Sequence, residues 1–395
     1  MPPKSSAPRY EQEVYMNGLA WHKPPFTFQS DQWEEEARKV LSANSFGYVR
    51  GNAGTSETYN KNLAAFQRWS ILPSRLVPSF RDDEGRELMA DTTTKLLGQE
   101  LPFPMAAAPV GVQKIFHAEG EIASARATGG VGIPYVMSTA SSTSIEDVAA
   151  AHDQGAKRND KIPVRWFQLY WPSREHDDIT ISMLNRAKKA GFTALFVTLD
   201  TYTQGWRPAD QDNGYNPFIH PDGAGGIGDA AREWTYTIVP GHSKSWEDLE
   251  FLKKHWDGPI VLKGIQTVAD ARKAVEAGMA GIVVSNHGGR QHNGGVSSLG
   301  VLPRIVDAVG DKLDVLFDSG IRSGVDIIKA IALGAKCVLV GRPYIYGLAI
   351  GGEDGVKHIL RSLWGDALLN LHLGGQRDLS EVNRDMLIKE DDLFR

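Results

Sequence analysis

The feature that most constrains the fold is an alternation of short apolar runs with helix-like amphipathic segments, which begins near residue 104. Strands that lack a polar face are buried on both sides, as in parallel sheets that helices cover. Eight such strand–helix units predict an α/β fold of the TIM (β/α)8 barrel type. An open doubly wound sheet is the alternative, although no Gly-x-Gly-x-x-Gly motif follows the first run. The runs are 104–110, 134–138, 164–170, 194–200, 259–264, 281–286, 314–320 and 337–341.

The other segments are expected to complete a single domain that spans residues 1–395. Residues 1–77 form an N-terminal segment in which the apolar spacing predicts two helices, over 30–49 and 58–69. We expect these helices to cap the barrel, which would occupy residues 78–373.

Three further stretches do not follow the strand–helix repeat. Residues 78–101 are interpreted as a short β excursion before the barrel begins. Residues 201–245, rich in Gly, Pro, Asn and Asp, far exceed the ~2–6 residues usual for a βα loop. This long loop follows the fourth strand and is a candidate lid for the active site. The charged tail, 374–395, is expected to wrap the surface or a neighbouring subunit.

Composition restricts the partners and the compartment. The net charge of −5 and the lack of a basic cluster argue against nucleic acid as a partner. No apolar stretch approaches the ~18–20 residues that span a bilayer, so no membrane segment is expected. The single cysteine, Cys337, cannot form an internal disulfide, which favours a reducing compartment. The chain has neither a secretory signal core nor a C-terminal peroxisomal tripeptide, so a cytoplasmic location is expected.

Polar residues of complementary types lie at or just after the ends of six consecutive apolar runs. In a TIM barrel the active site forms at the carboxyl ends of several strands at once. One polar strand end is an ordinary cap, but six in succession indicate an active site. The residues are Gln168 and Tyr170, Thr198, Asp200 and Arg207, Lys263, His287 and Arg290, Asp318 and Arg322, and Gly341 and Arg342.

Residues 285–295, SNHGGRQHNGG, place a histidine and an arginine among four glycines directly after an apolar run. Glycine lets a backbone bend sharply or approach another molecule closely. His287 and Arg290 would then be a proton acceptor beside an anion clamp. The alternative is a glycine-rich surface turn that holds two basic residues.

The loops after the last two runs, 318–324 and 340–343, each place glycine and arginine before a helix or turn. This position is a common phosphate site in TIM barrels, where Arg322 and Arg342 would add charge-assisted hydrogen bonds. The alternative is that both arginines form salt bridges. Lys263 would pair with a buried carboxylate, form a Schiff base, or face a cofactor that becomes negative, such as a reduced flavin. Neither a His-Glu-x-x-His motif nor a cysteine cluster is present, so no metal site is expected.

From about residue 40 to 365 the sequence resembles the FMN-dependent 2-hydroxy acid oxidase/dehydrogenase family, which includes glycolate oxidase and lactate oxidase. The motif SNHGGRQ in its strand–loop context carries the resemblance. Three further motifs occur in the order that the family shows: LKG at 262–264, FDSGIR at 317–322 and GRP at 341–343. Longer stretches, among them HGGRQHNGG and GRPYIYGLAIGG, are most similar to the lactate 2-monooxygenase branch.

The resemblance implies FMN as cofactor and a role for each matching residue. His287 would be the base that acts on the substrate, Asp200 would bind its other nitrogen, and Lys263 would lie near flavin N1. The substrate would be bound by Tyr48, Tyr170, Arg207 and Arg290, the first and last of them at its carboxylate. The residues implied to bind FMN are Val110, Gly111, Ser138, Gln168, Thr198, Lys263, Ser285, Asp318, Ser319, Gly320, Arg322, Gly341 and Arg342.

Two positions depart from the glycolate oxidase pattern. Ala140 stands where glycolate-type members carry a large aromatic residue, which alters one wall of the expected pocket. Gly111 stands where most oxidases carry alanine near flavin N5, and glycine there is the pattern of the monooxygenase branch.

The implied activity is oxidation of L-lactate by O2 to acetate, CO2 and water. One alternative is a 2-hydroxy acid oxidase that releases pyruvate, or another 2-oxo acid, and H2O2, and a second is an electron-carrier-linked dehydrogenase. A different class would be a non-catalytic phosphate-binding barrel. A small 2-hydroxy acid and O2 are the expected partners, and a homo-oligomer, either a tetramer or an octamer, is expected.

Overall fold

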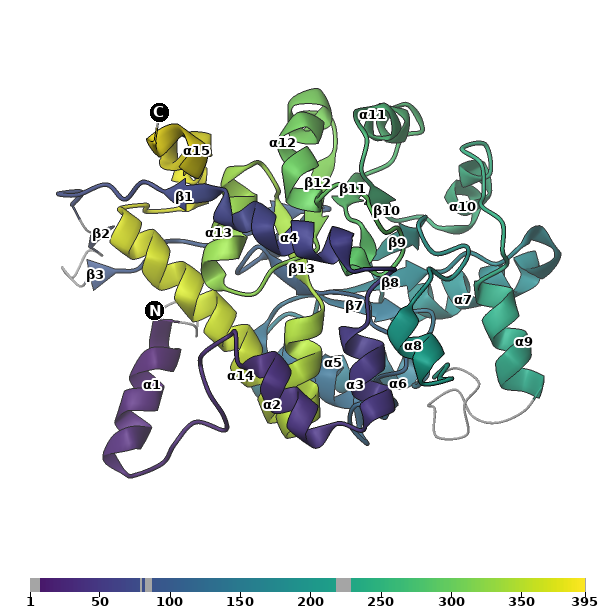
Figure 1. The fold of residues 1–395 in the computed structure, drawn as a ribbon, viewed down its shortest axis with the longest axis horizontal. Coiled ribbons are helices and arrows are strands. Elements are labelled where there is room, and N and C mark those ends of the chain that lie inside the picture. The colour runs from purple at the N-terminus through teal and green to yellow at the C-terminus, as the bar shows by residue number, and fades with distance from the viewer. Residues whose placement is uncertain (1–7, 79, 82–86, 218–228, 395) are drawn as a thin grey trace.

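The structure, a computed structural model, describes residues 8–78, 80–81, 87–217 and 229–394. Within these residues, eight parallel strands close into a barrel in which strands consecutive along the chain are neighbours (Figure 1). Each strand overlaps one predicted apolar run, so the TIM barrel is confirmed and the open sheet is wrong. The strands are β6 (Met105–Ala107), β7 (Tyr135–Ser138), β8 (Arg165–Leu169), β9 (Ala194–Thr198), β10 (Ile260–Ile265), β11 (Gly281–Val284), β12 (Asp314–Asp318) and β13 (Cys337–Val340).

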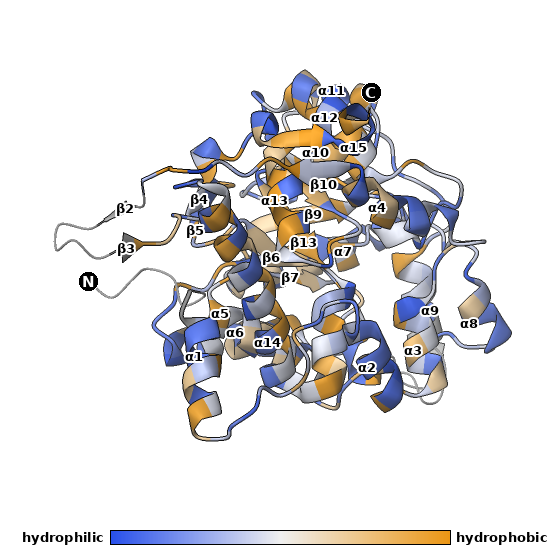
Figure 2. Ribbon diagram, turned by 60° about the vertical axis from the view of Figure 1, so that its left-hand side comes forward, coloured by the Kyte–Doolittle hydropathy of each residue, from blue (hydrophilic) through white to orange (hydrophobic). Residues whose placement is uncertain are grey.

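Helices surround the strands, and Figure 2 shows the apolar strands at the centre with polar residues on the outer helix faces. Several helices start at a side-chain cap, which satisfies backbone N–H groups that have no partner within the helix. Ser144 Oγ accepts from the backbone N of Asp147 at 3.1 Å, and Ser323 and Asp326 form a capping box. The surrounding helices are α5 (Gly120–Val131), α6 (Ile145–Arg158), α7 (Asp177–Lys189), α10 (Leu249–His255), α11 (Val268–Glu276), α12 (Ser298–Val309), α13 (Gly324–Ala332) and α14 (Arg342–Gly374).

The barrel interior is a packed apolar core. Trp166 stacks on Phe196 from the next strand, with ring centroids 5.1 Å apart. The hairpin of β4 (Thr94–Leu96) and β5 (Gln99–Leu101) packs against this core, and its Gln99 accepts a hydrogen bond from Trp166 Nε1 at 3.1 Å. The predicted β excursion over 78–101 is therefore confirmed for the residues that the structure describes, which leave out 79 and 82–86. It also contains the paired strands β2 (Phe80–Arg81) and β3 (Glu87–Leu88).

The N-terminal segment contains α1 (Pro8–Leu19), α2 (Trp33–Val40), α3 (Ala43–Arg50) and α4 (Glu57–Gln67). The prediction of one helix over 30–49 was wrong. Leu41 is extended, and Ser42 then caps a second helix by accepting from the backbone N of Ser45 at 3.1 Å. Serine competes for backbone N–H groups and so favours a new helix start over continuation.

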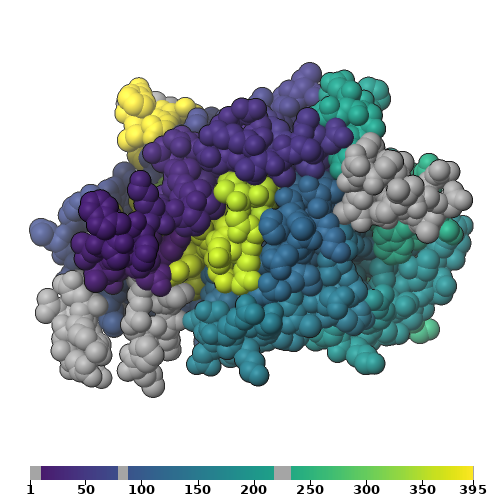
Figure 3. All heavy atoms as spheres, turned by 90° about the horizontal axis from the view of Figure 1, so that it is seen from below, coloured from purple at the N-terminus to yellow at the C-terminus, as the bar shows by residue number. Residues whose placement is uncertain are grey.

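The same segment spreads over one face of the molecule, as predicted for a cap (Figure 3). There α1, α2 and α3 contact the long helix α14. Two residues of α3, the helix that begins after the break at Ser42, line the cavity at the carboxyl ends of the strands: Tyr48 and Val49.

Of the two remaining predictions, the single long loop over 201–245 was incomplete, and the tail that wraps the surface is confirmed. The stretch 201–245 contains α8 (Pro208–Asp212) and α9 (Asp229–Ile238), and its residues 218–228 lie outside the described part of the chain. The tail wraps its own chain, because β14 (Leu387–Lys389) pairs antiparallel with β1 (Trp69–Ile71) and is followed by α15 (Glu390–Leu393). Among the helices described, none has the length and apolar character needed to cross a bilayer.

Candidate active site

Six of the residues that the resemblance implied for FMN form one buried polar layer above the barrel core. Side chains alternate across a strand, so the second residue after an inward-facing one also faces inward. The inward apolar residues are Val136, Trp166, Phe196, Val261, Val283 and Leu316. Two positions after each of them lie the buried residues Ser138, Gln168, Thr198, Lys263, Ser285 and Asp318. Hydrogen bonds join neighbours in this layer, with Gln168 Nε2 donating to Thr198 Oγ1 at 2.9 Å.

Lys263, on β10, contacts residues at the ends of the next two strands of the barrel, β11 and β12. Its Nζ donates to Ser285 Oγ at 3.1 Å and lies 3.2 Å from Asp318 Oδ2. Burial alone would lower the pKa of Lys263, but the carboxylates of Asp318 and Asp200 outweigh it and raise the pKa. The prediction of a buried carboxylate partner is confirmed. A charged ammonium also disfavours the Schiff base alternative, which needs a neutral amine.

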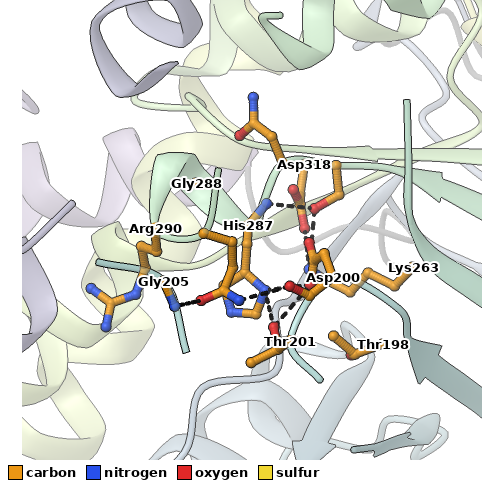
Figure 4. A network of polar contacts seen from close by, with 12 residues as sticks. Thr198, Asp200, Thr201, Gly205, Lys263, His287, Gly288, Arg290 and Asp318 are labelled. Atoms are coloured by element: carbon orange, nitrogen blue, oxygen red, sulfur yellow. Dashed lines mark hydrogen bonds and ion pairs between the residues drawn. The ribbon is translucent and has the colours of Figure 1, made fainter. Parts of the chain in front are cut away.

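His287 pairs with Asp200 across the carboxyl ends of β11 and β9 (Figure 4). The imidazole Nδ1 lies 2.9 Å from Asp200 Oδ1, as the resemblance implied. Burial lowers the pKa of His287, and Asp200 only partly restores it. Burial would raise the pKa of Asp200, but His287 lowers it to about 2. The pair therefore consists of a neutral imidazole oriented by a carboxylate at neutral pH.

The two predicted substrate arginines lie side by side. Arg290 Nη1 donates to the carbonyl oxygens of Tyr48 at 2.6 Å and Gly51 at 2.8 Å, at the C-terminal end of α3. Arg207 Nε donates to the carbonyl of Arg290 at 3.0 Å, and its Nη2 donates to Gln291 Oε1 at 2.7 Å. Burial lowers the pKa of Arg207 to about 10, and the charge of Arg290 is the next cause. This concentration of positive charge suits an anion.

Two tyrosines complete this part of the cavity. The Arg290 guanidinium lies 4.9 Å from the ring centroid of Tyr48. Tyr170 follows β8 and lines the same cavity, and burial, together with Tyr48, raises its pKa. All four predicted substrate residues are therefore brought together with His287 around one cavity of about 400 Å³.

The predicted phosphate residues also line this cavity, at the loops after β12 and β13. Arg342 donates to the carbonyls of Val49 (2.9 Å), Gly288 (3.0 Å) and Gly51 (3.1 Å) and to Asn52 Oδ1 (2.7 Å). Burial lowers the pKa of Arg342 to about 9.

Arg322 donates through Nη1 to the carbonyl of Ile321 at 2.8 Å, and its Nη2 is buried without a partner. In the described part of the chain, no carboxylate forms an ion pair with Arg322 or Arg342. The alternative of two salt-bridged arginines is therefore wrong. Ser319, Gly320 and Gly341 line the cavity beside them.

Gly111 and Ala140, the two departures from the glycolate oxidase pattern, touch each other. A Cβ on Gly111 would lie 2.8 Å from both the Cβ and the carbonyl oxygen of Ala140. The backbones are also joined, since Val112 N donates to that same oxygen at 2.9 Å. Gly111 and its neighbour Val110 line the cavity, so packing against Ala140 is by itself a reason for glycine at this position.

Sequence reasoning missed residues that support the site. Thr201 donates to Asp200 Oδ1 at 2.9 Å. Gln291 donates to the carbonyls of Asp200 at 2.7 Å and Thr203 at 2.9 Å, and so ties the segment after β9 to the loop after β11. Gln291 lies inside the motif SNHGGRQ, directly after Arg290, and this position was the available signal.

The cavity suits FMN, the cofactor that the resemblance implies. An FMN phosphate needs buried positive charge, which Arg342 and the unpartnered Nη2 of Arg322 provide. The flavin ring needs polar groups in a water-poor surface, and Lys263 and Asp318 provide such groups in the cavity lining. Ser138, Gln168, Thr198 and Ser285 belong to the same buried layer but are not part of the cavity lining.

Comparisons with known proteins agree with this description. The family model for FMN-dependent dehydrogenase matches residues 37–389. An FMN-dependent alpha-hydroxy acid dehydrogenase of Schizosaccharomyces pombe is 53% identical, over 97% of this chain and 96% of its own length. The L-lactate oxidase of Lysinibacillus sphaericus is 35% identical over 93% of this chain and 94% of its own.

Among solved structures, the crystal structure of a mandelate oxidase matches with a TM-score of 0.81 and 37% identity, covering 92% of this chain and 99% of the other. The barrel, its layer of strand-end residues and these matches lead to one conclusion. The chain belongs to the family of FMN-dependent alpha-hydroxy acid dehydrogenases, whose members use FMN to oxidise 2-hydroxy acids.

Proposed function

We propose that the protein oxidises L-lactate, or an L-2-hydroxy acid of similar size, with O2 as the electron acceptor. The observation that carries the proposal is the His287–Asp200 pair in the same cavity as Arg290 and Arg207. A base and an anion clamp around one small cavity suit a substrate whose hydroxyl and carboxylate are on adjacent carbons. The similarity to an L-lactate oxidase supports lactate as that substrate.

Arg290 would bind the substrate carboxylate. Among the described residues it donates hydrogen bonds only through Nη1, so Nε and Nη2 are free to form a bidentate pair with a carboxylate. Tyr48, Tyr170 and Arg207 would complete the anion pocket and orient the α-carbon. Fixing the substrate in this way removes much of the entropic barrier to reaction.

His287 would accept a proton from the substrate. Its lowered pKa keeps the imidazole neutral, and Asp200 stabilises the imidazolium once the proton has moved. When bound, FMN accepts the two electrons of this oxidation and passes them to O2. The charged ammonium of Lys263 would stabilise the negative charge of the reduced flavin.

For the products, we propose acetate, CO2 and water from L-lactate. In the first stage lactate and O2 give pyruvate and H2O2, and in the second H2O2 attacks pyruvate that is still bound and releases CO2. Retention of pyruvate decides the outcome, and the segment after β9, tied to the site through Gln291, is suited to retain it. The second candidate is an oxidase that releases pyruvate and H2O2, which the similarity to an L-lactate oxidase favours.

Product analysis tests the proposal. Purified enzyme is given L-lactate in air, and acetate, pyruvate and H2O2 are measured with and without catalase. We expect acetate with little free peroxide, whereas stoichiometric peroxide would establish the oxidase. If L-lactate does not reduce the flavin under anaerobic conditions, the assignment of L-lactate as substrate is wrong. We also expect kcat/KM for (S)-mandelate to be lower than kcat/KM for L-lactate.

We also propose a homo-oligomer, either a tetramer or an octamer. Leu19, the last residue of α1, and Trp21, just after it, are 76% and 92% exposed, and large exposed apolar residues favour association. Light scattering coupled to gel filtration would give the mass, and a monomer of 43.3 kDa would contradict the proposal.

A further inference from the structure

We propose that Tyr59 is a positioning residue that orders Arg322 and Arg342 for the phosphate of FMN. The proposal rests on the placement of that phosphate at the ends of β12 and β13. Tyr59 lies in the first turn of α4, in the N-terminal segment, and is buried at 7% exposure. Its role cannot be read from the barrel repeat, because α4 is not part of it.

Three guanidinium groups surround the Tyr59 ring. The Cζ atoms of Arg50, Arg342 and Arg322 lie 5.0, 5.2 and 5.9 Å from its centroid. These arginines come from α3, from the start of α14 and from the loop after β12. All three distances are within the range in which an aromatic ring attracts a cation.

The three arginines differ in their charge balance. Arg50 pairs with Glu34, with Nε 2.7 Å from Oε1. Among the described residues, the guanidinium groups of Arg322 and Arg342 donate only to neutral oxygens, whereas the backbone N of Arg322 donates to Asp326 Oδ2 at 2.9 Å. Their charges are therefore still available to an anion.

An aromatic ring is suited to this position for an electrostatic reason. It attracts guanidinium groups through its quadrupole but adds no net charge. A carboxylate in its place would also hold the arginines, but it would neutralise them and repel a phosphate dianion. Tyr59 would therefore hold like charges close together and preserve their attraction for the cofactor.

The position of Tyr59 is fixed relative to the barrel by two contacts. Gly289, at φ +75°, packs so closely that a Cβ on it would lie 2.7 Å from the backbone N of Tyr59. One turn along α4, the amides of Asn62 and Asn286 exchange two hydrogen bonds of 2.7 and 2.8 Å. The ring therefore sits on a rigid support directly after β11.

The experiment compares the affinities of the holoenzyme for FMN and riboflavin, which lacks the phosphate. Holoenzyme is equilibrated with excess riboflavin, and the bound flavins are separated and quantified to give the affinity ratio. The variants are Tyr59→Leu, which removes the ring, and Tyr59→Phe, which keeps it. Tyr10→Leu is the matched control. It also removes a tyrosine ring beside a guanidinium group, since Arg361 Cζ lies 4.0 Å from the centroid of the Tyr10 ring, but Tyr10 is in α1.

We expect Tyr59→Leu to lower the FMN-to-riboflavin ratio about tenfold, as two weakened cation–π contacts imply. Tyr59→Phe and Tyr10→Leu should remain within about twofold of the wild type. An unchanged ratio in Tyr59→Leu, or an equal loss in Tyr59→Phe, would overturn the role of the ring. If Tyr59→Leu does not accumulate, Tyr59→Met provides the same comparison. If Arg342→Ala also leaves the ratio unchanged, the placement of the phosphate itself is wrong.

Discussion

The two ends of the cavity differ in whether their basic side chains are paired with carboxylates. At the proton end, which comprises His287, Asp200, Lys263 and Asp318, each basic group has a carboxylate partner, at 2.9 Å for His287 and 3.2 Å for Lys263. At the anion end, the guanidinium groups of Arg322 and Arg342 contact neutral oxygens and the Tyr59 ring, and no carboxylate in the described part of the chain forms an ion pair with them.

The difference follows from what each end is proposed to do. A group that moves a proton needs a defined pKa and orientation, and a carboxylate partner provides both. A site for an anion must instead keep its positive charge uncompensated until the ligand arrives. Uncompensated buried charge is costly, so the ligand is expected to stabilise the anion end when it binds.

The largest effect is expected for His287→Ala, which tests the proton end alone. Losing a general base should slow anaerobic flavin reduction by L-lactate by ~10²–10⁴-fold. FMN content should stay normal, because the FMN phosphate is proposed to bind at the other end. Stopped-flow absorbance gives the reduction rate, and near-normal reduction would remove His287 from the role of base.

Arg342→Ala tests the anion end. Hydrogen bonds to a charged group contribute ~1.5–3 kcal/mol, so FMN should dissociate ~10–100-fold more readily. With FMN in excess, the reduction rate should change little. Flavin fluorescence on dilution of the holoenzyme measures the release, and the surface variant Arg38→Ala is the control. If Arg342→Ala binds FMN tightly but is reduced slowly, our assignment of phosphate binding to the anion end is wrong.

Arg290→Lys should have a smaller effect, confined to the substrate. An ammonium keeps the charge but cannot reproduce the planar fork that binds a carboxylate. We expect kcat/KM for L-lactate to fall about tenfold, with FMN binding unchanged. Steady-state oxygen uptake measures the first quantity and flavin content the second, and loss of FMN in this variant would contradict the assignment.

The smallest expected effect is a pH shift. Because the neutral imidazole is the active form, kcat/KM should be lost as pH falls through the pKa of His287. Burial lowers that pKa, so the acid limb should lie below the ordinary histidine value of about 6.5. Asp200 raises the pKa, so Asp200→Asn should move the limb to lower pH while reducing kcat. A limb that moves to higher pH would contradict the pairing.

The strand ends could be predicted because their pattern is local. Each inward-facing polar residue lies two positions after an inward-facing apolar one, and this period is a property of any extended strand. It was harder to anticipate where a side chain would cap a new helix in place of the first helix continuing. The break at Ser42, where a side chain caps a new helix in the middle of an amphipathic stretch, was missed, and Tyr48 could be assigned to the site only through the family resemblance.

The sequence by itself determined the barrel and the chemical types of residue that lie at its carboxyl end. Tertiary structure alone decided which of these residues meet. Lys263 pairs with Asp318, and Arg342 lies against the C-terminal end of α3 and the Tyr59 ring. Barrel closure and the docking of the N-terminal segment create these contacts between parts of the chain that are far apart. No local period encodes them, because separation along the chain does not specify distance in space.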